Sequence, residues 1–176
     1  QPINNTMNFD QWIDSYPDFP KPGILFRDIS PLLASPEGMS LAKKKLCEVV
    51  AAWDAEVVAG VDARGFLFST LIADELGLGS LMIRKSGKLP GEVISKSYEL
   101  EYGTNELSMQ KLPDLQNKRV VVVDDLLATG GTIKCANDLI ESQGAKVVGC
   151  AFVVELLFLK GSHLIDCETL SLQKYE

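Results

Sequence analysis

The sequence predicts an α/β protein with a central, mostly parallel, twisted sheet that is flanked by helices. Short apolar segments rich in β-branched residues alternate with longer segments that have the character of helices. One of the short segments, 120–123, is wholly apolar and β-branched, which is typical of a strand covered on both faces. Alternation of this kind favours parallel strands joined by helices. In such sheets ligands bind at the carboxyl ends of the strands.

Length and composition fit one folded unit. The chain has 176 residues, of which 46% are hydrophobic and 23% are charged, as in ordinary globular proteins. This length is sufficient for a complete core. Because we find no internal repeat, linker or low-complexity segment, we expect residues 1–176 to form a single domain.

The N-terminal part is predicted to start with a short helix at 10–16. Three prolines within 17–23 exclude regular structure there and predict a stiff, irregular crossing, because proline lacks an N–H and has a fixed φ. Ser35 and Pro36 then mark the start of a longer helix, with the serine as N-cap and the proline at the first position. This helix should run to about Trp53.

The rest of the chain is predicted to alternate between strands and helices. A strand at 57–61 precedes a helix at 66–76, which Gly77 should end. A second helix is expected at 133–143. Further strands are expected at 81–84, 95–102, 106–110, 119–123, 146–155 and 169–173.

The most informative motif is RVVVVDDLLATGGT at 119–132. Its buried strand should end at two carboxylates, Asp124 and Asp125. A small loop then opens a helix, whose free N–H groups and dipole favour a phosphate. The carboxylates would repel that phosphate and suit hydroxyls or a metal-bound water beside it, so the motif describes a site for ribose 5-phosphate. The loop residues are Ala128, Thr129, Gly130, Gly131 and Thr132.

Two further motifs suit a second phosphate group. Taken alone, the turn at 60–66 fits an ordinary strand-to-helix connection, and the run at 84–91 fits a solvated basic loop. In an acidic protein, however, cations gathered in a glycine-flanked turn favour diphosphate binding. Because Asp62, Arg84 and Asp124 all follow predicted strands, we expect them to face one crevice. The candidate residues are Asp62, Ala63, Arg64, Gly65, Arg84, Lys85 and Lys88.

Charge and cysteine spacing exclude several classes of protein. The net charge of −7 argues against nucleic-acid binding. The four cysteines are widely spaced and form no CxxC pair, so we expect no metal or redox motif. Residues 1–10 lack the features of a signal peptide and no apolar run could span a membrane. These observations predict a cytoplasmic protein with no membrane partner.

Together these motifs resemble the adenine-specific members of the type I phosphoribosyltransferase family. The resemblance covers about 9–175 and rests on YPDFPKPGILFRDISP, GVDARGFLF, IRKSGKLPGE, SYELEYG, VVVVDDLLATGGT and ELLFLKG, in that order. It implies the type I phosphoribosyltransferase fold with a small hood, from residues 1–35, over the base site. It also implies a homodimer.

The resemblance implies a reaction of purine salvage. Adenine and phosphoribosyl diphosphate (PRPP) would give AMP and diphosphate through an oxocarbenium-like transition state, with Mg2+ as cofactor. The metal would be carried by PRPP near Asp124 and Asp125, with no ligand bound directly from the chain. These two carboxylates would face the ribose hydroxyls, and residues 128–132 would hold the 5-phosphate.

The resemblance also assigns residues to the diphosphate, the base and the catalytic lid. The diphosphate region would contain Asp62–Gly65, Arg84, Lys85 and Lys88. The adenine pocket would contain Leu25, Phe26, Arg27 and Leu126, with main-chain groups on the base edge, Phe26 stacked on one face and Leu126 on the other. Glu101 and Tyr102 would lie in the lid, with Glu101 at N7 of adenine.

Two alternatives stay open. The same enzyme class could act on hypoxanthine, guanine or uracil, although the 25–27 segment and the SYELEYG motif argue against this. A non-enzymatic PRPP-binding regulator could share the fold. Such regulators usually carry a nucleic-acid-binding module, for which this acidic chain has no spare length.

Overall fold

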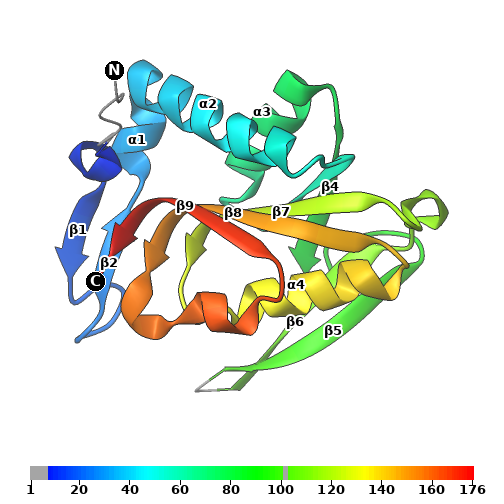
Figure 1. The fold of residues 1–176 in the computed structure, drawn as a ribbon. Helices are drawn as coiled ribbons and strands as arrows, with labels where there is room; N and C mark the ends of the chain where they lie inside the picture. Colours follow the sequence, from blue (N-terminus) through cyan, green and yellow to red (C-terminus); the bar gives the residue numbers. More distant parts are fainter. Residues whose placement is uncertain (1–7, 101–102) are drawn as a thin grey trace.

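A seven-stranded mixed sheet forms the centre of the computed structural model, which describes residues 8–100 and 103–176 (Figure 1). The strand order is β5-β6-β4-β3-β7-β8-β9. The five neighbouring strands β4, β3, β7, β8 and β9 run parallel, whereas β6 is antiparallel to both β4 and β5. The predicted α/β class with a mostly parallel sheet is confirmed. The strands are β3 (Val57–Val61), β4 (Gly79–Lys85), β5 (Val93–Leu100), β6 (Gly103–Gln110), β7 (Arg119–Leu127), β8 (Lys146–Leu156) and β9 (Glu168–Tyr175).

Helices cover both faces of this sheet (Figure 1). One face carries α1 (Ser30–Ala34), α2 (Pro36–Ala52) and α3 (Phe66–Leu76), and the other carries α4 (Gly131–Ser142). In the described ranges no helix is both long and apolar enough to cross a membrane. The short 3-10 helices are η1 (Phe9–Trp12), η2 (Pro113–Leu115), η3 (Leu157–Leu159) and η4 (Gly161–Leu164).

The core is divided into two layers by β7. Val120 and Val122 belong to the cluster beneath α4, whereas Val121 and Val123 belong to the cluster beneath α2 and α3. All four side chains are fully buried. Alternate side chains of a strand point to opposite faces, so an uninterrupted apolar run is required where both faces are covered. The prediction of a strand buried on both faces is therefore confirmed.

The helix predicted at 10–16 is wrong. Only η1 (Phe9–Trp12) is helical, and β1 (Asp14–Pro17) follows it. This strand pairs antiparallel with β2 (Leu25–Asp28), with Tyr16 opposite Phe26, in a separate two-stranded sheet. A partner strand later in the chain overrides the weak local helix signal. The proline-rich segment is the irregular turn of this hairpin and not a crossing, apart from Pro17, which ends β1.

The strand predicted at 119–123 is longer than expected. Pairing with β8 continues through Asp124 opposite Phe152 and Leu126 opposite Val154, so β7 extends to Leu127. The two aspartates therefore project from within the strand and not beyond its end. The predictions for β3, for α3 and for the N-cap of α2 are confirmed, since the Ser35 hydroxyl accepts a hydrogen bond from the Gly38 N–H at 2.9 Å.

The end of α3 provides a test of the local backbone. Gly77 has φ of 68° and no atom would touch an added Cβ, so Gly77→Ala should destabilise only through backbone strain. We expect a loss of about 1 kcal/mol in the free energy of unfolding, measured by urea denaturation. Gly79→Ala is the matched control, because its Cβ would meet Val57 at an ordinary 3.8 Å. Equal losses in the two variants would contradict this explanation.

Candidate functional site

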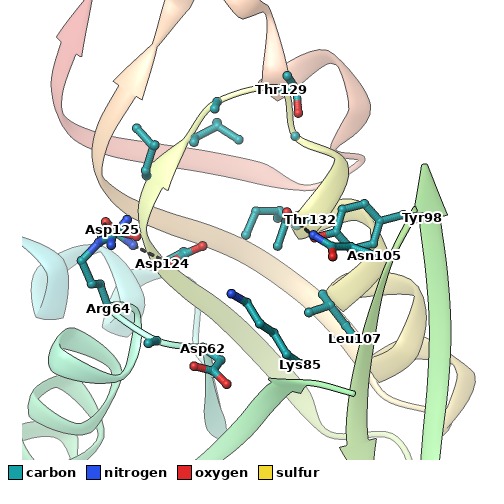
Figure 2. A pocket seen from close by; sticks show the side chains of 16 residues that line it. Asp62, Arg64, Lys85, Tyr98, Asn105, Leu107, Asp124, Asp125, Thr129 and Thr132 are labelled. Carbon is teal, nitrogen blue, oxygen red and sulfur yellow. Dashed lines mark hydrogen bonds and ion pairs between the residues drawn. The ribbon is translucent and has the colours of Figure 1, made fainter. Parts of the chain in front are cut away.

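A cavity of about 370 Å³ lies at the carboxyl ends of the central strands (Figure 2). Its walls come from the loop after β3, the end of β4, the end of β7 with the loop that follows, and the β5–β6 hairpin. Asp62 and Asp124 both line it, as the expected shared crevice requires. Arg84 does not belong to the lining. Its Nε instead donates a hydrogen bond to Asp62 Oδ2 at 3.2 Å.

The two aspartates of β7 have different partners. Asp125 is 8% exposed, and its Oδ2 lies 2.6 Å from Arg64 Nε in an ion pair. Asp124 projects from the opposite face of the strand, and its Oδ1 accepts a hydrogen bond from the Asp125 N–H at 2.8 Å. In Figure 2 the Lys85 side chain extends into the cavity toward Asp124. Both aspartates line the cavity, and Asp125 in addition anchors Arg64.

Burial controls the protonation of these groups. Loss of hydration raises the pKa of the Asp124 carboxyl well above its usual range, and the negative charge of Asp125 raises this pKa further. The hydrogen bond to Asp125 raises the pKa of the Arg64 guanidinium. The nearby carboxylates of Asp124 and Asp28 act in the same direction on Arg64. Asp28 ends β2, so its charge acts on the cavity from the N-terminal hairpin.

The start of α4 forms one edge of the cavity. Gly130 precedes the helix with φ of 89°, and no side chain caps the first turn. The N–H groups there are consequently available to a ligand, and the helix dipole adds positive potential. A Cβ at Gly130 would collide with the carbonyl oxygen of Gly161, which explains why the loop needs glycine. Ala128, Thr129, Gly130 and Thr132 line the cavity.

The loop after β3 provides a second edge. Ala63 and Arg64 line the cavity, and the peptide bond between Asp62 and Ala63 is cis. At Gly65, a Cβ would clash with main-chain oxygens of Val61 and Val123, so this loop packs closely on two strands. Of the three cations in the basic run at 84–91, Lys85 lines the cavity. Lys88 lies beyond the lining.

The residues expected to bind adenine lie in two places. Leu126 lines the main cavity, whereas Phe26 lines a separate hollow of about 310 Å³. The Phe26 ring packs edge-on against Phe19, with 5.2 Å between the ring centroids. The Arg27 side chain is already engaged, because Nη1 donates to Ser15 Oγ at 2.7 Å and the guanidinium stacks over Tyr175 at 3.7 Å. These two contacts hold the Arg27 side chain toward β1 and β9.

Two predicted site residues, Glu101 and Tyr102, lie outside the described residues. The hairpin on either side of them contributes cavity residues that the sequence did not single out as ligands, namely Tyr98, Asn105 and Leu107 (Figure 2). The polar, extended character of 97–103 indicated a hairpin or a lid. Only the pairing of β5 with β6 shows which of its side chains face the cavity.

The fold is that of the type I phosphoribosyltransferases. The chain belongs to the phosphoribosyl transferase family, because the sequence model of the phosphoribosyl transferase domain matches residues 31–163. It is 47% identical to the adenine phosphoribosyltransferase of Rhodospirillum rubrum over 170 residues, which are 97% of this chain and 99% of that protein. The predicted resemblance to the adenine-specific members is confirmed.

Solved structures agree with this assignment. The adenine phosphoribosyltransferase of Thermoanaerobacter pseudethanolicus superposes with a TM-score of 0.90 at 43% identity, covering 95% of this chain and 98% of that one. The Saccharomyces cerevisiae adenine phosphoribosyltransferase, in a complex with adenine and an imino-altritol bisphosphate, superposes with a TM-score of 0.86 at 36% identity. The match covers 93% of this chain and 96% of that one.

The raised pKa of Asp124 predicts a specific effect of pH on stability. Between the unfolded-state pKa of about 3.9 and the higher folded-state value, the folded protein binds more protons, so stability falls as pH rises through this window. Asp124→Asn stays neutral and can keep the hydrogen bond from the Asp125 N–H. We therefore expect the variant to be more stable than the unsubstituted protein at about pH 7.

This difference should shrink toward about pH 4, where both proteins have a neutral side chain at this position. Urea denaturation across this range measures it. If the stability of Asp124→Asn relative to the unsubstituted protein were lower at neutral pH than at acidic pH, the raised pKa of Asp124 would be contradicted.

Proposed function

We propose that this chain transfers the phosphoribosyl group of PRPP to adenine, which yields AMP and diphosphate for purine salvage. The observation that carries this proposal is the single cavity in which an uncapped helix start, an inward-facing aspartate and the Asp62–Arg64 loop meet. The naming of the relatives as adenine phosphoribosyltransferases supports the choice of base.

The start of α4 is the proposed site of the 5-phosphate. Main-chain N–H groups of 128–132 and the Thr132 hydroxyl would donate to the phosphate oxygens, and the dipole of α4 would favour their charge. Asp124 would accept hydrogen bonds from the ribose hydroxyls. Asp125 would act with it by holding Arg64 beside the cavity. Gly131 begins the helix and lets the chain approach the phosphate closely.

The diphosphate would lie along the opposite edge of the cavity. The main-chain N–H groups of Ala63 and Arg64, the Arg64 guanidinium and the Lys85 ammonium are the proposed donors. The N–H groups of Asp62 and Gly65 already donate to the carbonyl oxygens of Ile83 and Val61, so these two residues shape the loop. Preorganised cations stabilise the charge that develops on the departing diphosphate. Arg84 would contribute by orienting Asp62 through its hydrogen bond. Lys88 would extend the positive field at the entrance.

Magnesium fits this site as part of the substrate. No group of three or more potential metal-ligating side chains occurs in the part of the chain that the structure describes. The donors near the diphosphate edge are separate carboxylates such as Asp62 and Asp124, which suit the waters of a metal carried by PRPP. Bound there, Mg2+ would neutralise part of the diphosphate charge.

Adenine would bind between the cavity and β2, under a hood formed by residues 1–35. Within the described residues β2 pairs with β1 alone, so its other edge presents main-chain N–H and C=O groups to a base edge. Phe26 would stack on one face of the ring and Leu126 on the other, with Leu25 and Arg27 contributing main-chain atoms. A main-chain acceptor matched to the adenine amino group would be left unpaired by hypoxanthine, which disfavours that base.

The transfer exchanges two bonds at the anomeric carbon of the ribose. The bond to N9 of adenine forms as the bond to diphosphate oxygen breaks, and the electron pair leaves with the diphosphate. Adenine must lose a proton, and Glu101 is the proposed group that takes or holds it at N7. Tyr102 would help to close the site, because an oxocarbenium-like species reacts with water unless water is excluded.

We also propose a homodimer in the cytoplasm. Leu67 on α3 and Met82 on β4 are each nearly half exposed, which suits a surface that a second copy covers. The four cysteines are all free thiols, as is usual in a reducing compartment.

A base panel tests the activity directly. With PRPP and Mg2+, we expect release of diphosphate on addition of adenine and not on addition of hypoxanthine, guanine or uracil. Release with another base would keep the enzyme class but overturn the adenine pocket. Binding of PRPP without turnover of any base would instead identify a regulator.

Lys85→Ala tests the diphosphate edge. Loss of a charge-assisted hydrogen bond should lower kcat/KM for PRPP by about tenfold or more, measured in the same assay. Lys44→Ala is the matched control, because Lys44 is exposed on α2, outside the lining of the cavity. Equal activity of the two variants would remove Lys85 from the binding site.

A further inference from the structure

Tyr98 connects the β5–β6 hairpin to the start of α4. Its ring lies against Gly131, where an added Cβ would be 3.6 Å from Cδ2. Its hydroxyl oxygen lies 3.0 Å from Thr132 Oγ1 in a hydrogen bond. Tyr98, Thr132 and Asn105 all line the main cavity, and Figure 2 shows them together on the side opposite Asp62. A residue of the hairpin thus touches the first turn of the helix that forms the phosphate site.

Either hydroxyl can donate in the Tyr98–Thr132 hydrogen bond, and a third side chain, Asn105, lies beside it. Asn105 lies directly across the hairpin from Tyr98, and its Nδ2 donates to the Tyr98 oxygen at 3.5 Å. A phenol has one proton to donate, and its oxygen can accept at the same time. In the arrangement in which Tyr98 donates to Thr132 Oγ1, the phenol uses its one proton and its oxygen still accepts from Asn105. The proton of the Thr132 hydroxyl is then free to point into the cavity.

We propose that Tyr98 is a positioning residue that orients the Thr132 hydroxyl as a donor to the 5-phosphate of PRPP. The inference rests on the proposed function, because it takes the start of α4 as the phosphate site. A hydroxyl that already accepts from Tyr98 donates more strongly, since successive hydrogen bonds polarise one another. Asn105, Tyr98 and Thr132 would form a directed series of donors that ends at a phosphate oxygen.

The hairpin has other attachments to α4, so Tyr98 is not needed merely to hold it. Lys96 Nζ lies 2.6 Å from Asp138 Oδ2, and Cys135 Sγ donates to the Lys96 carbonyl oxygen at 3.3 Å. Removing only the Tyr98 hydroxyl leaves these contacts and the ring packing on Gly131. Tyr98→Phe therefore isolates the orientation of Thr132 from the docking of the hairpin.

The test is isothermal titration calorimetry with ribose 5-phosphate and, separately, with diphosphate. We expect Tyr98→Phe to weaken ribose 5-phosphate binding by about three- to tenfold and to leave diphosphate binding unchanged. Thr132→Val should weaken ribose 5-phosphate binding at least as much. In the Thr132→Val background, Tyr98→Phe should have no additional effect, because the hydroxyl that it orients is gone.

Tyr175→Phe is the matched control. Its hydroxyl bonds to Asp10 and lies outside the cavity lining, so ribose 5-phosphate should bind with unchanged affinity. Equal loss of affinity for both ligands in Tyr98→Phe would show a general structural role and overturn the proposal. Unchanged affinity for ribose 5-phosphate in Tyr98→Phe would overturn the role of Tyr98 and leave the proposed function standing. If the unsubstituted protein itself fails to bind ribose 5-phosphate, the proposed function fails and the inference fails with it.

Discussion

The site depends on the position of β7 in the middle of the sheet. This strand pairs with β3 on one side and β8 on the other, and apolar side chains cover both of its faces. Because alternate side chains point to opposite faces, two adjacent aspartates are directed into different surroundings. Both aspartates line the cavity, but Asp125 is paired with Arg64 near the start of α3. A single rigid strand therefore supplies one group for a ligand and one anchor for a neighbouring loop.

The same strand holds a carboxyl group in surroundings that disfavour its negative charge. The Asp124 carboxyl is kept close to an apolar strand and to a second carboxylate, and both features disfavour its charge. In the proposed function, ribose hydroxyls and metal-bound water supply the polar partners that the protein itself provides only in part. Functional sites commonly retain local conflicts of this kind at the expense of stability.

The protein is acidic overall, yet the cavity suits anions. The net charge is −7, but the two edges of the cavity present main-chain N–H groups, and Arg64 and Lys85 add local positive charge. Short-range donors decide the affinity of such a site, because distant surface charges are screened by salt. Close packing of the glycines Gly65 and Gly130 against main-chain oxygens keeps these donors in place.

The sequence alone determined the parts that depend on short windows of chain. An uninterrupted apolar run predicted β7, and helix signals predicted α3. The rule that ligands bind at the carboxyl ends of parallel strands predicted that Asp62 and Asp124 share one cavity. Only the tertiary structure decided the features that depend on distant partners. Residues 14–17 form a strand because β2 pairs with them, and the Arg84 side chain donates to Asp62 without lining the cavity itself. Local sequence restricts backbone conformation, whereas the direction of a side chain depends on atoms that folding brings to it.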